Sequence, residues 1–318
     1  MSNFSFLIIG TNKISDSFAE AARAVGVDLL AVYSRKSDTG RAFAEKHGIK
    51  RVYSNLSEAL FDSEIDAVYV ASPTFLHKEH SIMALRAGKH VLCEKSIASS
   101  ASEYEEMLAA AKENKRVLLE AMRPAFDPAL PLILKGLSSI GKIRRANLEF
   151  CKYSTRYDNF KRGIVENAFN PQIKNSALSD IGVYPLWLSV ELFGEPREIK
   201  SEKIFLENGF LAMGASTLTY GDFFVNVTYS KITESTAPSF IEGECGAVFI
   251  DKVSEPKKLW IVMNDGQKIP IDYTPCENNM RYEISEFVRI CTSGEDFSRR
   301  AKVSLSVMRV ADMIHSHV

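Results

Sequence analysis

The sequence lacks an excess of charge of one sign, a long apolar run and, in its first residues, the features of a signal peptide. Its 39 lysine and arginine residues face 40 aspartate and glutamate residues, which leaves a net charge of -1. Binding of nucleic acid through a basic face is therefore not expected. No apolar stretch approaches the roughly 20 residues that cross a bilayer, and the opening MSNFSFLIIG has no basic flank or cleavage site. We expect neither nucleic acid nor a membrane as a partner.

The five cysteines are widely spaced and form no C-x-x-C pair. This argues against a disulfide framework and against a zinc site, so we expect no metal. Such cysteine usage is typical of a reducing compartment, and we predict a cytoplasmic protein. With 318 residues, 46% of them hydrophobic, the chain is long enough for about two globular domains.

The N-terminal part alternates between short apolar runs and segments with helical spacing. Strands are predicted at residues 4–9, 28–34, 66–71, 90–93 and 117–121, and helices at 14–25, 39–47, 75–87 and 102–114. This alternation builds right-handed crossover units and a parallel sheet that is covered on both faces. We predict an α/β class with a doubly wound Rossmann domain over residues 1–121.

The pattern changes after residue 122, where strand-like runs follow one another with only turns between them. These runs are 142–153, 197–205, 212–220, 223–231, 239–244, 247–251, 259–262 and 268–273. Helices at 178–193, 281–292 and 302–315 are expected to cover one face of the resulting sheet. We predict an α+β domain over 122–318 with an open, mostly antiparallel sheet, which binds the substrate. Its uncovered face predicts a homodimer or a homotetramer.

The stretch FLIIGTNKIS joins the first strand to the first helix. It keeps one glycine of G-x-G-x-x-G, Gly10, and has Asn12 and Ser15 in the other two places. Gly10 can make the tight turn, Asn12 tolerates a left-handed backbone, and Ser15 is small. The helix N-terminus presents N–H groups to a phosphate. Candidate cofactor residues are Gly10, Thr11, Asn12, Lys13 and Ile14. A plain strand-to-helix connection is the alternative.

The second predicted strand ends at Ser34 and is followed by Arg35. Rossmann proteins that select NAD carry an acidic residue here, roughly 20 residues after the loop. A hydroxyl and a guanidinium instead suit a 2′-phosphate, and the guanidinium can stack on adenine. We predict Ser34 and Arg35 as cofactor residues and NADP as the cofactor, with NAD possible. An exposed loop arginine is the alternative.

Two longer stretches carry motifs. ASPTFLHKEHSIMALRAGKHVLCEKSIA covers 71–98, and NPQIKNSALSDIGVYPLWL covers 170–188. They resemble the patterns A-[TS]-P-N-x-x-H, A-G-K-H-V-x-C-E-K-P and G-G-A-L-x-D-x-G-x-[HY] of the glucose-fructose oxidoreductase, inositol dehydrogenase and rhizopine-catabolism family (Gfo/Idh/MocA). EAMRP at 120–124 and MRYEISEF at 280–287 extend the resemblance over essentially the whole chain.

This resemblance implies a Rossmann domain followed by a domain with an open sheet. It also implies oxidation or reduction of sugars, polyols and related alcohols with a nicotinamide cofactor. Asp180 and Tyr184 would face the substrate. For His77, which would lie along the cofactor, the alternative is a surface position at a helix N-terminus. The implied cofactor residues are Ser72, Pro73, Thr74, Leu76, His77 and Arg123, with Glu94 and Lys95 beside the nicotinamide ribose.

A proton must leave or reach the reacting oxygen when a hydride is transferred. No histidine lies between His90 and His315. Where many members of the resembled family have histidine, this chain has Tyr184, as in the dihydrodiol dehydrogenase and glucose-fructose oxidoreductase branches. A phenol has a pKa of about 10, which an ammonium from Lys95 would lower. We predict Tyr184 and Lys95 as catalytic residues, with a core or rim tyrosine as the alternative.

Asp180 is the third catalytic candidate. Its carboxylate would orient Lys95 or a substrate hydroxyl, but Pro185 suits only the first turn of a helix, so Asp180 could instead be the N-cap. Arg156 and Tyr157 are expected at the end of a strand. Substrate-binding candidates are Arg156, Tyr157 and Asn170, with surface or packing roles as the alternative.

The chain departs from the family patterns at several places: Asn12, Ser15, Thr74, Ser96, Asn175 and Ser176. Without a proline ring at Ser96 the Lys95 side chain could wander. These changes put cofactor affinity and rate in doubt more than the fold. We predict an oxidoreductase acting on a sugar, polyol or diol. A non-catalytic, regulatory nucleotide-binding protein is the alternative.

Overall fold

The computed structural model describes residues 4–316. Within them the chain forms two compact units, each described by itself: 4–122 with 277–302, and 123–276 with 303–316. The predicted domain limits, 1–121 and 122–318, remain a prediction. The boundary between the two units lies near the predicted one, after residue 122. Residues 277–302, however, belong to the first unit.

The first unit is built on a six-stranded parallel sheet in the order β3-β2-β1-β4-β5-β6. Its strands are β1 (Ser5–Ile9), β2 (Asp28–Tyr33), β3 (Arg51–Tyr53), β4 (Ala67–Val70), β5 (His90–Glu94) and β6 (Leu118–Ala121). The predicted Rossmann sheet is confirmed. The strand order reverses between β1 and β4, and ligands of such sheets bind at the carboxyl ends of the strands beside that point.

Helices connect these strands, as the alternation of patterns predicts. They are α1 (Lys13–Val25), α2 (Ser37–His47), α3 (Leu56–Phe61), α4 (His77–Arg86) and α5 (Ala101–Glu113). The sequence reasoning did not find β3 or α3. Their three and six residues are too short to show a period.

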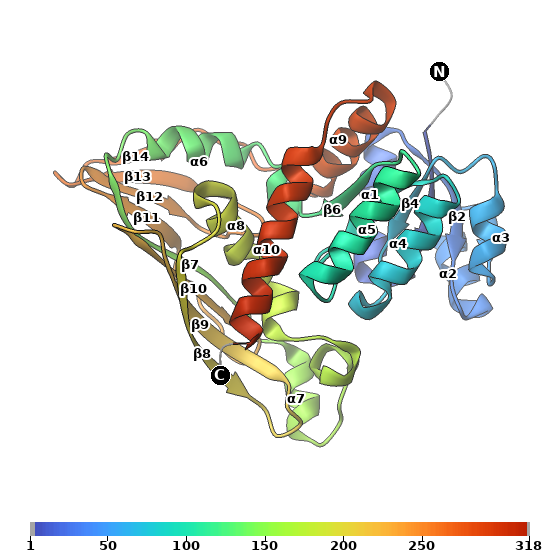
Figure 1. Ribbon diagram of the computed structural model, residues 1–318, viewed down its shortest axis with the longest axis horizontal. Helices are drawn as coiled ribbons and strands as arrows, with labels where there is room; N and C mark the ends of the chain where they lie inside the picture. The colour runs from blue at the N-terminus through green and yellow to red at the C-terminus, as the bar shows by residue number, and fades with distance from the viewer. Residues whose placement is uncertain (1–3, 317–318) are drawn as a thin grey trace. The chain divides into compact units, whose positions relative to one another are not determined.

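Helix α9 (Met280–Ser293) also belongs to the first unit and packs on α1 (Figure 1). The ring of Phe287 lies 6.4 Å from that of Phe4 and 5.8 Å from that of Phe6. The prediction that a helix over 281–292 covers the sheet of the second domain is therefore wrong. Periodicity identifies the apolar face of a helix, but it does not identify the partner that covers this face.

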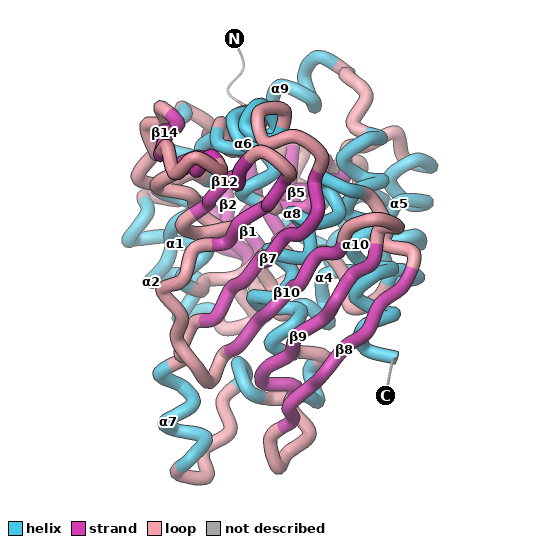
Figure 2. The backbone as a smooth tube through the Cα atoms, turned by 90° about the vertical axis from the view of Figure 1, so that its left-hand side faces the viewer, coloured by secondary structure: helices cyan, strands magenta, loops and turns pink. Residues whose placement is uncertain are grey.

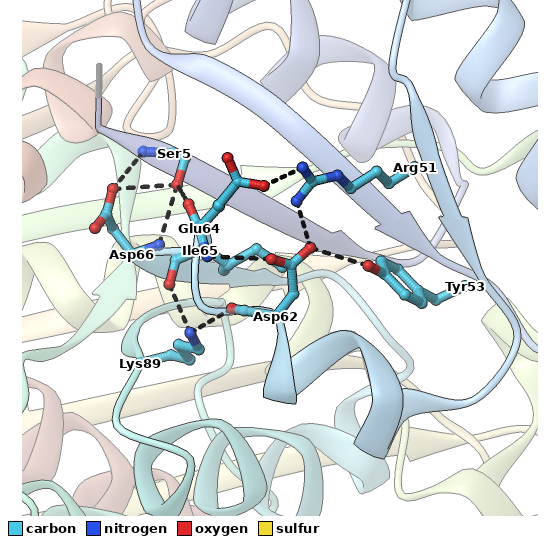
Figure 3. Close-up of polar contacts among 8 residues, drawn as sticks. All are labelled: Ser5, Arg51, Tyr53, Asp62, Glu64, Ile65, Asp66 and Lys89. Carbon is cyan, nitrogen blue, oxygen red and sulfur yellow. Dashed lines mark hydrogen bonds and ion pairs between the residues drawn. The ribbon is translucent and has the colours of Figure 1, made fainter. Parts of the chain in front are cut away.

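A polar network fastens the amino ends of the parallel strands (Figure 3). The ammonium of Lys89, just before β5, donates to the carbonyl oxygens of Asp62 and Ile65, both at 2.7 Å. Ser5, at the start of β1, binds the carboxylate of Asp66 through its backbone N–H at 2.9 Å. Burial lowers the pKa of Lys89. The lysine of A-G-K-H-V thus serves the fold, at the opposite end of the strands from the candidate cofactor loops.

The second unit contains an eight-stranded sheet in the order β14-β13-β12-β11-β7-β10-β9-β8, and Figure 2 shows β7, β10, β9 and β8 side by side. Its strands are β7 (Ile143–Cys151), β8 (Glu198–Phe205), β9 (Leu211–Thr219), β10 (Phe224–Ser230), β11 (Ser239–Gly243), β12 (Gly246–Ile250), β13 (Leu259–Met263) and β14 (Lys268–Ile271). Among the described strands of this sheet, β7 and β10 pair in parallel and the other neighbours pair antiparallel. The predicted open, mostly antiparallel sheet is confirmed.

Helices α6 (Ala129–Leu137) and α8 (Val183–Phe193) pack on strands of this sheet. Helix α10 (Ser298–Ser316) ends against β8, where the ammonium of Lys203 donates to the carbonyl oxygen of Ile314 at 3.1 Å. Among the described residues, no helix is long and apolar enough to cross a membrane, and no three metal-binding side chains gather at one place.

The chain after β7 differs from the prediction. Strand β7 ends at Cys151, and residues Thr155–Lys161 form the short helix α7, so Arg156 and Tyr157 do not end a strand. A backbone hydrogen bond from the N–H of Tyr157 to the carbonyl of Ser154 begins this turn at 2.8 Å. A seven-residue polar helix carries too little apolar periodicity to be told from a strand end.

Candidate active site

The loop after β1 is held tightly against the end of β4. Gly10 has φ of +107°, and a β-carbon there would lie 2.7 Å from the carbonyl oxygen of Ala71. Asn12 donates from Nδ2 to that same oxygen at 2.8 Å. Both the left-handed backbone and the close approach require glycine at position 10.

Asn12 caps helix α1. Its Oδ1 accepts from the backbone N–H groups of Ile14 and Ser15, both at 3.1 Å, and its φ of −92° is extended. Asn12 therefore does not use the left-handed backbone that asparagine tolerates, because an N-cap residue lies in the extended region. Two N–H groups that a phosphate would use are bonded within the chain. Thr11 and Lys13 flank this cap.

At the end of β2, Arg35 is exposed, whereas Ser34 is buried. The hydroxyl of Ser34 lies 2.7 Å from that of Thr39, in the first turn of α2. Arg35 is thus the accessible group of the predicted pair. Thr39 was not predicted as a neighbour of this site, because a lone threonine in a helix start is no motif.

The segment after β4 carries Ser72, Pro73, Thr74 and Leu76, which are half-buried or exposed around a single 3₁₀ turn. His77 follows at the start of α4 and is only 1% exposed. The alternative of a surface histidine is therefore wrong. Its Nε2 lies 2.8 Å from the carbonyl oxygen of Ser72.

His77 joins two loops through its ring. Nδ1 lies 2.9 Å from the carbonyl oxygen of Ser96, opposite the contact to Ser72. Burial lowers the pKa of His77 to about 4, against the opposing effect of the two carbonyl groups. A neutral ring has one N–H and donates to one of the two carbonyls.

The segment after β5 holds Lys95, which is half-buried. Besides the contact of Ser96 to His77, the N–H of Ile97 donates to Oε1 of the buried Glu120 at 3.0 Å. Glu94, also buried, accepts from the hydroxyl of Tyr69 at 2.5 Å. The backbone beside Lys95 is thus fastened on its carboxyl side although no proline follows it. Glu120 is a supporting residue that sequence reasoning quoted only as part of EAMRP.

In the second unit, Arg123 is half-buried and its guanidinium pairs with Glu255. Asp180 lies in the middle of a π-helical turn, Leu178–Gly182, that continues into α8. The N-cap alternative for Asp180 is therefore wrong. The wider π turn precedes Pro185, whose ring provides no N–H for the regular α-helical pattern.

Tyr184, one turn after Asp180, is 5% exposed, and its ring centroid lies 5.7 Å from that of Phe150 on β7. The carboxylate of Asp180 forms an ion pair of 2.8 Å with Lys231, which follows β10. Sequence reasoning missed Lys231, because a single lysine at a strand end carries no motif.

The three predicted substrate residues have partners within the second unit. Arg156 forms an ion pair with Glu166 at 3.3 Å. The ring of Tyr157 stacks on Phe169 at 5.8 Å, and Asn170 accepts from the N–H of Gln172 at 3.0 Å. Their predicted roles toward a substrate stay predictions.

Known proteins resemble this chain over nine-tenths of its length or more. A family model described as "Oxidoreductase family, NAD-binding Rossmann fold" (GFO_IDH_MocA) matches residues 4–122. The scyllo-inositol 2-dehydrogenase (NADP(+)) IolU of Bacillus subtilis is 42% identical over 286 residues, 90% of this chain and 87% of that protein. The chain belongs to the Gfo/Idh/MocA family.

Other members and structures agree with this assignment. Trans-1,2-dihydrobenzene-1,2-diol dehydrogenase of Danio rerio is 27% identical to this Gfo/Idh/MocA protein, over 92% of this chain and 90% of that protein. The crystal structure of KijD10, a 3-ketoreductase from Actinomadura kijaniata in complex with NADP and TDP-benzene, superimposes with a TM-score of 0.87. At 23% identity, over 99% of this chain and 97% of that one, it shows the shared fold.

The predicted family and enzyme class are thus confirmed: this Gfo/Idh/MocA protein is an NAD(P)-dependent oxidoreductase that acts on CH–OH groups. The residues of the first unit fit a dinucleotide, since the N-terminus of α1 and the exposed Arg35 follow the carboxyl ends of the parallel strands β1 and β2, where such sheets bind ligands. The non-catalytic alternative is not supported.

Proposed function

We propose that this enzyme interconverts a ring hydroxyl and a carbonyl of a cyclic polyol, with NADP(H) as its cofactor and scyllo-inositol as the first candidate substrate. The proposal is carried by the 42% identity to an NADP-dependent scyllo-inositol 2-dehydrogenase across nine-tenths of the chain. Dihydrodiols and sugars are further candidates, in line with the dihydrodiol dehydrogenase relative.

The preference for NADP is supported by charge. The end of β2 carries no acidic residue; Arg35 is exposed there and its neighbour Ser34 is bonded to Thr39. A guanidinium binds a 2′-phosphate strongly, whereas the 2′-hydroxyl of NAD gains little from it. Gly10, Thr11, Asn12, Lys13 and Ile14 would lie along the pyrophosphate.

We assign the chemical roles as follows. The bound nicotinamide supplies or accepts the hydride. Tyr184 exchanges the proton of the reacting oxygen through its hydroxyl. Lys95 supplies a positive charge that stabilises negative charge on the reacting oxygen. Asp180 accepts a hydrogen bond from a substrate hydroxyl.

The remaining predicted residues are assigned supporting roles. His77 holds the segment that follows Lys95 through the carbonyl of Ser96. The other proposed cofactor contacts are Ser72, Pro73, Thr74, Leu76, Glu94 and Arg123, and the other proposed substrate contacts are Arg156, Tyr157 and Asn170. We place the enzyme in the cytoplasm, because its odd, widely spaced cysteines favour a reducing compartment.

Titration of the purified enzyme with NADPH and NADH, followed by a substrate panel, tests this function. The panel contains scyllo-inositol, myo-inositol, a trans-dihydrodiol and glucose, each with NADP⁺ and NAD⁺. We expect tighter binding of NADPH than of NADH and reduction of NADP⁺ by scyllo-inositol. Equal affinities would contradict the cofactor preference, and turnover of glucose alone would contradict the substrate.

A further inference from the structure

Lys231 has an unusual environment for a lysine, because its side chain is only 5% exposed. Its Nζ donates to the carbonyl oxygen of Ala168 at 2.7 Å and lies 5.0 Å from the ring centroid of Phe169 and 5.4 Å from that of Phe210. Both phenylalanines are fully buried. The ammonium is thus enclosed by an acceptor and two aromatic faces, which attract a cation.

The backbone of Lys231 is fixed as well. Its N–H donates to the carbonyl of Ala212 at 2.9 Å, and its carbonyl accepts from the N–H of Ser154 at 3.0 Å. Strand β9 and the segment before α7 therefore hold this residue. The ammonium has little freedom to follow a partner that moves.

The turn that carries Asp180 is pressed on the same strand. A β-carbon on Gly182 would lie 2.7 Å from Cγ of Tyr229, which is two residues before Lys231 on β10. No side chain larger than hydrogen fits there without a shift. This contact brings the π turn close enough for the carboxylate of Asp180 to reach Nζ of Lys231 at 2.8 Å.

The two charges of this pair are exposed to different degrees. The side chain of Asp180 is 38% exposed, against 5% for Lys231. A buried ammonium without a counter-ion is strongly unfavourable, whereas a half-exposed carboxylate keeps part of its hydration. Lys231 is therefore the anchored partner, and Asp180 is the partner that solvent and a substrate can reach.

We propose that Lys231 is a positioning residue, which holds the Asp180 carboxylate in the orientation that accepts a hydrogen bond from a substrate hydroxyl. This inference deepens the proposed function and rests on it. A carboxylate can only accept hydrogen bonds. The pair therefore favours substrates that present a hydroxyl donor at this position.

Steady-state kinetics with scyllo-inositol and NADP⁺ test the positioning role in Lys231→Met and Asp180→Asn. We expect each variant to lose about 10- to 100-fold in kcat/KM, as for one hydrogen bond to a charged group. We expect the double variant to lose no more than the more affected single variant, because both changes remove the same interaction. Lys203→Met is the matched control, since the ammonium of Lys203 also binds carbonyl groups, those of Ile314 and His315.

Thermal unfolding of the same variants tests the anchored charge without any substrate. Asp180→Asn removes the carboxylate that pairs with a buried ammonium, whereas Lys231→Met leaves a carboxylate that water reaches. We expect Asp180→Asn to lower Tm by more than Lys231→Met does.

Two results would overturn the proposal. One is wild-type kcat/KM in Lys231→Met at a temperature where it is folded, which would leave Lys231 a structural role only. The other is a larger loss of Tm in Lys231→Met than in Asp180→Asn. Failure of the wild-type enzyme to oxidise scyllo-inositol would instead count against the proposed substrate, and the unfolding comparison would still decide whether Lys231 is the anchor.

Discussion

At the scale of single residues, Asn12 explains how a loop with one glycine keeps its shape. The side chain bridges the N-terminus of α1 and the end of β4, and it occupies the N–H groups of Ile14 and Ser15. A phosphate must compete with Oδ1 for these donors. Asn12 in place of glycine is therefore expected to stabilise helix α1 and to lower the affinity for the cofactor.

We expect Asn12→Gly to bind NADPH more tightly than the wild-type enzyme and to lose about 1 kcal/mol in the free energy of unfolding. Fluorescence titration with NADPH and urea unfolding measure the two effects. Asn55→Gly is the control, because Asn55 caps α3 through the N–H groups of Ser57 and Glu58. It should cost stability and leave the affinity unchanged. Weaker NADPH binding by Asn12→Gly would show that Oδ1 does not compete with the phosphate.

His77 links stability to pH. Its pKa falls from 6.5 to about 4 on folding, because burial disfavours the charged ring. The unfolded chain therefore binds the proton more readily, so this contribution is complete above pH 6.5 and is lost as the pH falls toward 4. From pH 8 to pH 5 we expect His77 to account for a loss of about 2 kcal/mol in the free energy of unfolding.

Urea unfolding of the wild-type enzyme and of His77→Asn at these two pH values isolates this effect. The wild-type enzyme should lose more stability than the variant, since His80 and His90 contribute in both proteins. Equal losses would mean that His77 is not kept neutral by the fold.

At the scale of elements, the segment after β5 decides where Lys95 can act. Its backbone is bonded to Glu120 through Ile97 and contacts His77 through Ser96. These contacts hold the segment in place, although Ser96 stands where the family pattern has a proline. The concern that Lys95 could wander without this proline is answered for the backbone by side chains of β6 and α4.

Glu120→Ala should lower kcat by about tenfold and the free energy of unfolding by about 1–3 kcal/mol, because the N–H of Ile97 loses its acceptor. Glu103→Ala removes a similar bond, from the N–H of Ser99 to Oε2 at 3.0 Å, and serves as the control. The control should lose stability and keep kcat. A wild-type kcat in Glu120→Ala would show that the hydrogen bond to this segment is not needed for catalysis.

Much of the element pattern could be predicted because it follows local rules. Alternating apolar runs and helical spacing identify the parallel sheet, and turns between apolar runs identify the open sheet. The packing partner of α9 could not be predicted, because Phe287 can be buried against any apolar surface. The short helix α7 gave too few residues for a period.

The candidate site divides in the same way. Motifs predict Lys95, Asp180 and Tyr184 as site residues, because these residues lie in long patterns. Lys231 is found only in the folded chain, since its link to Asp180 depends on how β10 and a π turn pack. Motif residues can also serve the fold alone, as Lys89 does.

At the scale of the whole molecule, the open sheet predicts self-association. Phe240, Phe249 and Trp260 form a ladder across β11, β12 and β13, with the last two rings stacked at 5.2 Å. All three are only half-buried in the chain. The cations of Arg145 and Lys268 lie over the rings of Phe240 and Trp260, at 5.3 and 4.9 Å from the ring centroids. Half-buried aromatic residues beside arginine are common in subunit contacts.

Light scattering at micromolar concentration should therefore give the mass of a dimer or a dimer of dimers. Trp260→Glu should reduce that mass to the monomer's, because a charge in a buried contact is strongly unfavourable. A monomeric wild-type enzyme would remove the predicted role of this face.

The rate of hydride transfer in a single turnover of Tyr184→Phe tests the central claim, that a phenol exchanges the substrate proton. The substrate is the one identified by the panel, and Tyr220→Phe is the control, because the hydroxyl of Tyr220 binds Ser189 within the fold. We predict a rate at least about 100-fold below the wild-type rate in Tyr184→Phe, with NADPH affinity retained, and a wild-type rate in the control. A wild-type rate in Tyr184→Phe would contradict the account.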